Sequence, residues 1–223
     1  MNIAISQRVI KPEKGEDRDC LEQDYVKYYS NHGFTLIPIS NVIEDMEGHL
    51  KKLNIRGVIL SGGNDVNPKV YGEKEAGEYS NERDFTERRL IDFVIKNKLP
   101  LLGECRGMQF INVYFGGKLR KIEGHVAKRH KIFICNPEFK ENLGKEETFV
   151  NSFHNKGILK EDLSKELVAF AISQDKSIEG FFHPRHNIMG IMWHPERGGC
   201  EESINQMIIN RFLKNLNPRH STP

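Results

Sequence analysis

Short apolar segments alternate with amphipathic ones through the first half of this sequence. The apolar segments read as buried strands: NIAIS (2–6), FTLIPIS (34–40), RGVIL (56–60) and LPLLG (99–103). Between them, apolar residues recur at helical spacing over about 19–32, 41–53 and 82–98. Strands that are apolar throughout are typical of parallel sheets covered on both faces. The pattern therefore predicts a doubly wound, mostly parallel α/β sheet with helices on both faces.

The second half has a different sequence pattern, with short segments typical of β-strands separated by turns. They are HKIFIC (130–135), ETFVNSF (147–153), LVAFAIS (167–173), SIEGFF (177–182) and IMGIMW (188–193). We expect them to add antiparallel strands and one edge of the sheet, before a last helix over about 201–216. Without a visible linker, one domain is expected over 1–217, followed by a polar tail at 218–223.

Charge and hydropathy exclude several classes of partner. The chain carries 33 Lys and Arg against 31 Asp and Glu, interspersed, so no basic stripe for nucleic acid is expected. The N-terminus becomes charged too soon for a signal peptide, and no apolar run approaches the roughly 20 residues that a membrane span needs. We expect a soluble cytoplasmic protein that binds neither nucleic acid nor membrane. The oligomeric state is not determined by these patterns.

The four cysteines form no closely spaced pair. Cys20, Cys105, Cys135 and Cys200 lie far apart, which argues against a zinc knuckle or a redox dithiol and favours free thiols. Cys105 differs from the others in its setting, Gly103-Glu104-Cys105-Arg106-Gly107, between an apolar strand and a helical pattern. A strand, a G-x-C-x-G turn and a helix would display the thiol as a nucleophile. The alternative is a small buried hydrophobic residue.

A cysteine nucleophile needs a base, and the segment MWHPE offers one. His194 and Glu196 are two residues apart, so in an extended chain both side chains point to one face. Glu196 would orient the imidazole and stabilise its cation, while His194 exchanges protons with the thiol and the leaving group. The alternative is a surface histidine beside a solvated acid.

The segment ILSGGND (59–65) places two glycines directly after a buried strand. Their main-chain N–H groups, with that of Arg106, are suited to stabilise an oxyanion, and Gly63 and Arg106 form the natural pair. Taken alone, this segment is equally consistent with an ordinary turn that has no catalytic role. Together, the Gly-Gly turn, the cysteine and His-Pro-Glu each end a predicted strand, and ligands of open α/β sheets bind at that carboxyl edge.

These motifs resemble those of the class I glutamine amidotransferases, and within them the stand-alone γ-glutamyl hydrolases. The resemblance rests on SGGNDVNPKVYG, LPLLGECRGMQFINVYFGG, VNSFHNKGI and IMGIMWHPE, and spans nearly the whole chain. It implies a catalytic triad of Cys105, His194 and Glu196, a glutamyl-thioester intermediate, and no cofactor or metal. It also implies an oxyanion hole made by the N–H groups of Gly63 and Arg106.

The resemblance further implies residues that hold the glutamyl group. These are Gln109, Asn151, Ser152, Phe153 and His154, with an ordinary strand-end turn as the alternative for the last four. One position departs from the family pattern, because Glu104 stands where relatives commonly have an apolar residue. A carboxylate beside the nucleophile would oppose thiolate formation unless it is paired or points elsewhere.

The expected reaction is hydrolysis of a γ-glutamyl amide to glutamate and an amine. The leaving group suggested by the resemblance is a cytidine nucleotide phosphoramidate of bacterial capsule biosynthesis; γ-glutamyl-GABA and γ-glutamyl peptides are alternatives. No residue pattern identifies a cytidine. Phosphate contacts are available from Lys69, Lys118, Arg120, Lys128, Arg129 and Lys156.

Three rival hypotheses remain open from the sequence. The first is a glutaminase subunit that supplies ammonia to a separate synthetase. The second is a metal-dependent hydrolase that uses His183 and His186 with His154 or His194. The third is a noncatalytic binding module in which Cys105 is inert.

Overall fold

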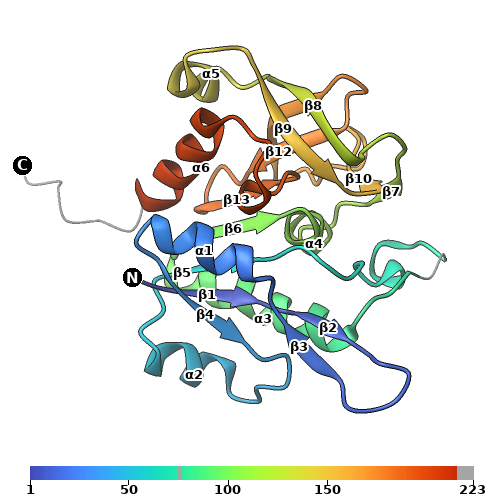
Figure 1. The fold of residues 1–223 in the computed structure, drawn as a ribbon, viewed down its shortest axis with the longest axis vertical. Helices are drawn as coiled ribbons and strands as arrows, with labels where there is room; N and C mark the ends of the chain where they lie inside the picture. Colours follow the sequence, from blue (N-terminus) through green and yellow to red (C-terminus); the bar gives the residue numbers. More distant parts are fainter. Residues whose placement is uncertain (75–76, 215–223) are drawn as a thin grey trace, which may run out of the picture.

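The computed structural model describes residues 1–74 and 77–214, and a nine-stranded sheet runs through it (Figure 1). The strand order is β4-β1-β5-β6-β13-β12-β11-β8-β9. Its strands are β1 (Asn2–Ser6), β4 (Thr35–Ile39), β5 (Gly57–Leu60), β6 (Leu101–Glu104), β8 (Val126–Ile134), β9 (Glu147–Phe153), β11 (Val168–Ser173), β12 (Ile178–Phe182) and β13 (Ile188–Ile191).

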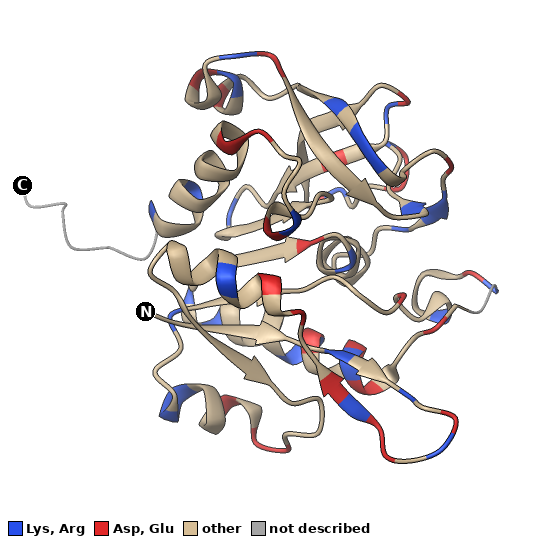
Figure 2. Ribbon diagram, in the orientation of Figure 1, with Lys and Arg blue, Asp and Glu red and all other residues tan. Residues whose placement is uncertain are grey.

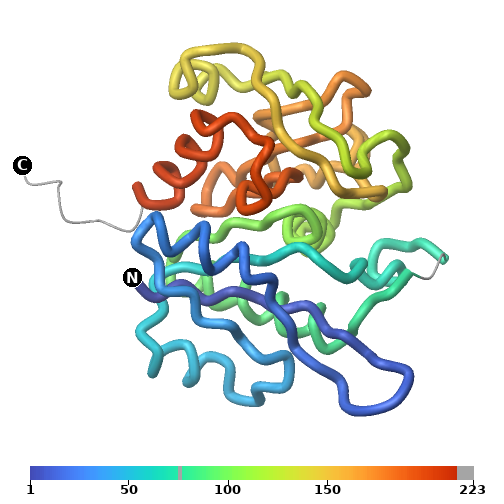
Figure 3. Tube along the Cα trace, viewed as in Figure 1, coloured from blue at the N-terminus to red at the C-terminus, as the bar shows by residue number. Residues whose placement is uncertain are grey.

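The first five strands in that order are parallel and the other four are antiparallel. The predicted α/β fold, with an added antiparallel region at one edge, is therefore confirmed. The path in Figure 3 shows the N-terminal and C-terminal halves of the chain meeting where β6 lies beside β13. Because these central strands are parallel, β5, β6 and β13 end at the same edge of the sheet.

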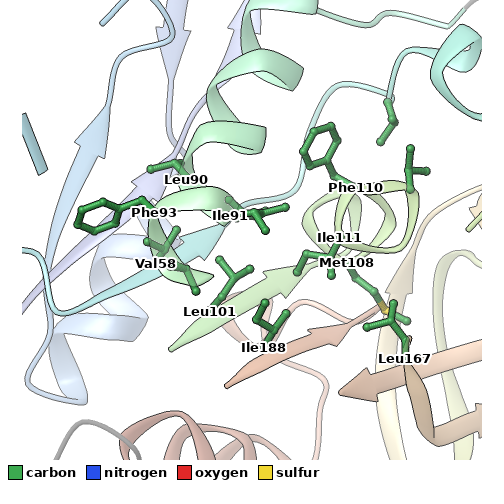
Figure 4. Packing of buried hydrophobic residues seen from close by; sticks show 14 of the residues in the cluster. Val58, Leu90, Ile91, Phe93, Leu101, Met108, Phe110, Ile111, Leu167 and Ile188 are labelled. Atoms are coloured by element: carbon green, nitrogen blue, oxygen red, sulfur yellow. The ribbon is translucent and has the colours of Figure 1, made fainter. Parts of the chain in front are cut away.

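Helices cover both faces of the parallel strands (Figure 1). The helices are α1 (Gln23–Asn31), α2 (Met46–Lys52), α3 (Asn81–Asn97), α4 (Arg106–Tyr114), α5 (Pro137–Leu143) and α6 (Glu202–Lys214). Within β5, Val58 faces the cluster that contains α2, α3 and α4, whereas Ile59 faces the cluster that contains α1 and α6. Figure 4 shows the first cluster, where Leu90 and Ile91 of α3 approach Val58. The strands are thus apolar throughout because both faces are buried.

Three local predictions need correction. The segment between the first predicted strand and the first predicted helix contains a two-stranded ribbon, β2 (Arg8–Ile10) with β3 (Arg18–Cys20), so the first helix begins later than predicted. The second helix also begins late, because Asp45 caps it through the N–H of Gly48. Helix α5 was not predicted, although Asn136, Pro137 and Gly144 supply its cap, first turn and end. The predicted tail at 218–223 lies outside the described residues.

Three short elements complete the order: η1 (Pro68–Tyr71), η2 (Pro195–Arg197) and a ribbon of β7 (Arg120–Lys121) with β10 (Lys156–Gly157). Figure 2 shows both charge signs spread over the helices and loops. By contrast, the five parallel strands carry a single charged side chain, Glu104 at the end of β6. Across residues 1–74 and 77–214, no helix has the length and hydropathy of a membrane span.

A buried ion-pair network joins helix α3 to two turns at the carboxyl edge of the sheet. Arg106, at the start of α4, pairs with Asp84 and Glu87 of α3, and Glu87 also accepts from Arg83 Nε at 2.9 Å. Arg83 Nη2 donates to the carbonyls of Ser61 and Gly62 at 2.7 and 2.8 Å. Arg83, Glu87 and Arg106 are at most 2% exposed. The network therefore ties the turn after β5 to the turn after β6.

Replacing Glu87 by Gln should destabilise the fold strongly, because the buried Arg83 loses its carboxylate partner and Arg106 keeps only Asp84. Breaking a buried ion pair costs about 3–5 kcal/mol of unfolding free energy. Urea unfolding measures the change, with Glu47→Gln, which removes an exposed ion pair, as the matched control. Equal stabilities of the two variants would contradict a structural role for the network.

Candidate active site

Cys105 occupies a strained turn between β6 and α4. Its φ of 50° and ψ of −104° lie outside the regions that residues with a side chain ordinarily adopt. The turn is held by the Cys105 N–H, which donates to the carbonyl of Ile191 at 2.8 Å, and by the Gln109 N–H, which donates to the Cys105 carbonyl at 3.0 Å. A side chain on Gly107 would meet the Leu60 carbonyl oxygen at 2.1 Å, so glycine lets α4 pack directly against β5.

His194 follows β13 at the same edge of the sheet as Cys105. Its Nδ1 lies 2.8 Å from Glu196 Oε1, and both side chains are at most 2% exposed. Burial alone would lower the pKa of His194, but the charge and hydrogen bond of Cys105, together with Glu196, raise it to about 10. The imidazole therefore lies between the thiol and the carboxylate as a cation at neutral pH.

Asn151 fixes the main chain of His194. Its Nδ2 donates to the carbonyls of His194 and Gly198 at 2.6 and 2.5 Å, and its Oδ1 accepts from the His194 N–H at 2.8 Å. The sequence placed Asn151 among the residues that hold substrate. In the structure its side-chain amide forms hydrogen bonds with the main chain of His194.

The Gly-Gly turn after β5 lies against these residues. A side chain on Gly62 would meet His194 Cε1 at 2.8 Å, and the Gly62 N–H donates to Tyr25 Oη at 2.9 Å. Gly63 has a φ of 118°, and a side chain there would meet Arg83 Nη1 at 2.7 Å. Arg106 is the first residue of α4, where main-chain N–H groups have no partner within the helix. The structure thus brings Gly63 and Arg106 to the edge where Cys105 lies.

The other predicted glutamyl contacts differ in accessibility. Gln109 is 4% exposed, and its Nε2 donates to the Lys156 carbonyl at 2.9 Å. Ser152 is fully buried and donates to the His125 carbonyl at 2.6 Å. His154 is also buried, with Nδ1 2.9 Å from the Lys156 carbonyl oxygen. Phe153 is 41% exposed, with its ring centroid 5.9 Å from that of His194.

Glu104 is fully buried beside Glu196. Tyr29 Oη donates to Glu104 Oε1, while Oε2 of both glutamates is buried without another hydrogen-bond partner among the described residues. Burial, and then the negative charge of Glu196, raise the pKa of Glu104 well above its usual range. A protonated Glu104 that donates to Glu196 satisfies both oxygens. The carboxyl group beside the nucleophile is therefore neutral and does not oppose the thiolate.

Sequence reasoning missed the tyrosines and the α3 network behind the site. Tyr25 and Tyr29, four residues apart on α1, are fully buried and place their hydroxyls on Gly62 and Glu104. The sequence carries two signals for these contacts. One is the helical spacing of Tyr25 and Tyr29, and the other is Glu104, a single acid in an apolar strand. The proposed histidine metal set is not assembled, because His183 and His186 precede β13 at the edge opposite His194.

We expect Glu104→Gln to flatten the pH dependence of stability. A carboxyl whose pKa is raised in the folded state contributes stability below about pH 4.5 that is lost as pH rises through its folded pKa. Urea unfolding at pH 5 and pH 8 should show wild-type stability falling with pH more steeply than that of the variant. Parallel profiles would contradict a neutral Glu104.

Comparison with known proteins adds family and fold neighbours. The Peptidase C26 family model matches residues 3–196. The gamma-glutamyl-CDP-amidate hydrolase of Campylobacter jejuni subsp. jejuni serotype O:2 is 38% identical over 94% of this chain and 95% of its own. The gamma-glutamyl-gamma-aminobutyrate hydrolase of Escherichia coli O157:H7 is 25% identical over 90% and 87%. A glutamine amidotransferase structure from Thermotoga maritima superposes with a TM-score of 0.63 at 17% identity, covering 100% of this chain and 86% of that one.

Proposed function

We propose that this chain, which belongs to the Peptidase C26 family of class I glutamine amidotransferase-like proteins, is a hydrolase of γ-glutamyl amides with Cys105 as its nucleophile. One observation carries the mechanism: a buried His194 lies between the Cys105 thiol and the Glu196 carboxylate. That arrangement activates a thiol for attack on a carbonyl carbon. The named activities of the two hydrolases above support the substrate class.

The proposed reaction has two steps. The Cys105 thiolate attacks the γ-carbonyl carbon, the C–N bond breaks, and His194 gives its proton to the leaving amine. His194 then removes a proton from water, which attacks the glutamyl thioester. The C–S bond breaks, which releases glutamate and regenerates the Cys105 thiolate. The N–H groups of Gly63 and Arg106 stabilise the oxyanion in both steps. The Gly62 N–H is already used by Tyr25, which leaves Gly63 as the donor from that turn.

We assign two kinds of role around the glutamyl group. Gln109 and the exposed ring of Phe153 would contact it, since the Gln109 N–H donates to the Cys105 carbonyl and the Phe153 ring lies against His194. Asn151, Ser152 and His154 would act by positioning, because their side chains are bonded to the main chain around them.

The leaving group would lie beside Gly63. A hollow of about 560 Å³ opens there, lined by Arg8, Val9, Ile10, Lys11, Gly63, Asn64, Asp65, Glu78 and Tyr79. Arg8 and Lys11, whose ion pairs with Glu22, Asp17 and Glu82 are partly exposed, would exchange these partners for a phosphate, and Tyr79 offers a ring for a base. With the 38% identical relative, this hollow supports a γ-glutamyl nucleotide phosphoramidate, the CDP-amidate of capsule biosynthesis, as substrate. Two of the basic residues suggested by the sequence for phosphate contacts already have partners. Arg120 forms an ion pair with Asp162, and Arg129 Nε donates to the Gly199 carbonyl.

Glutamate release from a substrate panel tests the reaction and its specificity. The panel comprises glutamine, γ-glutamyl peptides, γ-glutamyl-GABA, folyl polyglutamate and a γ-glutamyl nucleotide phosphoramidate. Cys105→Ala should lower kcat by roughly four orders of magnitude or more, because nothing replaces the nucleophile. Cys135→Ala, at an exposed cysteine, is the control. Unchanged turnover in Cys105→Ala would refute the mechanism, and a preference for glutamine would favour an ammonia-supplying subunit.

Arg8→Gln tests the hollow. If Arg8 contacts a leaving-group phosphate, its loss should lower kcat/KM for the phosphoramidate about tenfold, equivalent to about 1.4 kcal/mol. A γ-glutamyl anilide, which has no phosphate, should be affected much less. Arg56→Gln, at the opposite end of β5, is the control. An equal loss on both substrates would place the leaving group elsewhere.

A further inference from the structure

A second cluster of chemistry-bearing side chains lies outside the triad. Three histidines surround Glu179, which is fully buried on β12. His125 Nδ1 and His154 Nε2 lie 3.5 and 3.8 Å from Glu179 Oε1, and His130 Nε2 lies 3.5 Å from Glu179 Oε2. His125 precedes β8, His130 lies within it, and His154 follows β9.

The atoms that face one another in this cluster are buried and lack partners. Among the described residues, none donates to or accepts from His125 Nδ1, His130 Nε2, His154 Nε2 or Glu179 Oε2. His125 and His154 are each 5% exposed. Ser177 Oγ donates to Glu179 Oε1 at 3.4 Å, but Oε2 has no hydrogen-bond partner among the described residues. Because burying a charge is costly unless it is paired, a cation at the centre of this convergence would stabilise it.

The opposite ring nitrogens show which atoms carry lone pairs. His154 Nδ1 lies 2.9 Å from the Lys156 carbonyl, which only accepts, so the proton is on Nδ1. His125 Nε2 lies 2.9 Å from Asp175 Oδ2, which places its proton on Nε2. In the neutral rings, His154 Nε2 and His125 Nδ1 therefore carry no proton, and their lone pairs face the Glu179 carboxylate. Histidines that bind metals are held in this way, by a carbonyl or a carboxylate on the far nitrogen.

The spacing also suits a metal ion. Ligands about 2.0–2.1 Å from a tetrahedral zinc ion are about 3.3 Å from one another. The three measured separations, 3.5, 3.5 and 3.8 Å, are slightly wider than that edge. One ligand atom from each of His125, His154 and Glu179 lies within 4.8 Å of the others. Imidazole ligands suit Zn²⁺ as well as copper, iron and nickel ions, and the near-tetrahedral spacing favours Zn²⁺ among them.

We propose that His125, His154 and Glu179 form a zinc site separate from the catalytic triad, with His130 facing the other oxygen of Glu179. The ion would join the start of β8, the end of β9 and β12. It would also fix the segment that carries Ser152, whose hydroxyl bonds the His125 carbonyl, and Lys156, whose carbonyl bonds Gln109. The ion takes no part in the thioester chemistry. Its sequence signal is hidden, because the ligands are spread over more than fifty residues.

Zinc binding is best measured in the full chain carrying Cys105→Ala, so that neither the reactive thiol nor turnover affects the result. After removal of metal with a chelator, the chain should bind about one Zn²⁺, as measured by elemental analysis and by competition with a chromophoric chelator. Glu179→Gln, added to this background, should abolish stoichiometric binding because a charged ligand is lost. His186→Ala, at a histidine outside the cluster, should leave binding unchanged.

Asp175→Asn provides a milder test if Glu179→Gln does not fold. Asp175 has a side chain 46% exposed and touches the cluster through His125 Nε2, so the fold should survive the change. Losing such an outer carboxylate lowers metal affinity about tenfold to a hundredfold. Co²⁺ loaded in place of zinc should show a tetrahedral spectrum without thiolate bands. Absence of stoichiometric binding in the parent chain, or zinc affinity unchanged in Asp175→Asn, would overturn the proposal.

Discussion

The site depends on the buried ion pairs that join α3 to two turns of the sheet edge. Glu87 lies between Arg83 and Arg106, one of which holds the Gly-Gly turn while the other begins the elbow helix. Together with the pairing of β5 and β6, that link sets the turn of Gly63 relative to the turn of Cys105. Buried charges are costly to desolvate, and here the Arg83 guanidinium also donates to two main-chain carbonyls, which offsets part of that cost.

A second electrostatic arrangement controls protonation around the nucleophile. Glu196 faces His194, whose pKa is raised to about 10, whereas burial and the neighbouring Glu196 raise the pKa of Glu104, which also accepts from Tyr29. Two carboxylates in contact in a buried site repel each other, so Glu104 takes the neutral form. The hydrogen bond to His194 is made by Glu196.

Much of this architecture follows from sequence patterns, and the exceptions have physical causes. Apolar strands alternating with helices predicted the parallel sheet, and three strand ends predicted a shared edge for Cys105, His194 and Gly63. The β2–β3 ribbon was missed because its strands are only three residues long and three of their six residues are charged. The contact of the Asn151 side chain with the main chain of His194 was not predicted, because a contact between residues forty-three positions apart leaves no local signal. The buried histidines around Glu179 were hidden for the same reason.

The central claim is that Cys105 is the activated thiol of a γ-glutamyl site. Its most direct test is mass spectrometry of the intact protein and its peptides after treatment with an electrophilic glutamine analogue. The account predicts a single adduct on the peptide that contains Cys105, formed slowly when His194 is replaced by Ala. It also predicts protection by a γ-glutamyl substrate. No adduct, or labelling spread over Cys20, Cys135 and Cys200, would contradict it.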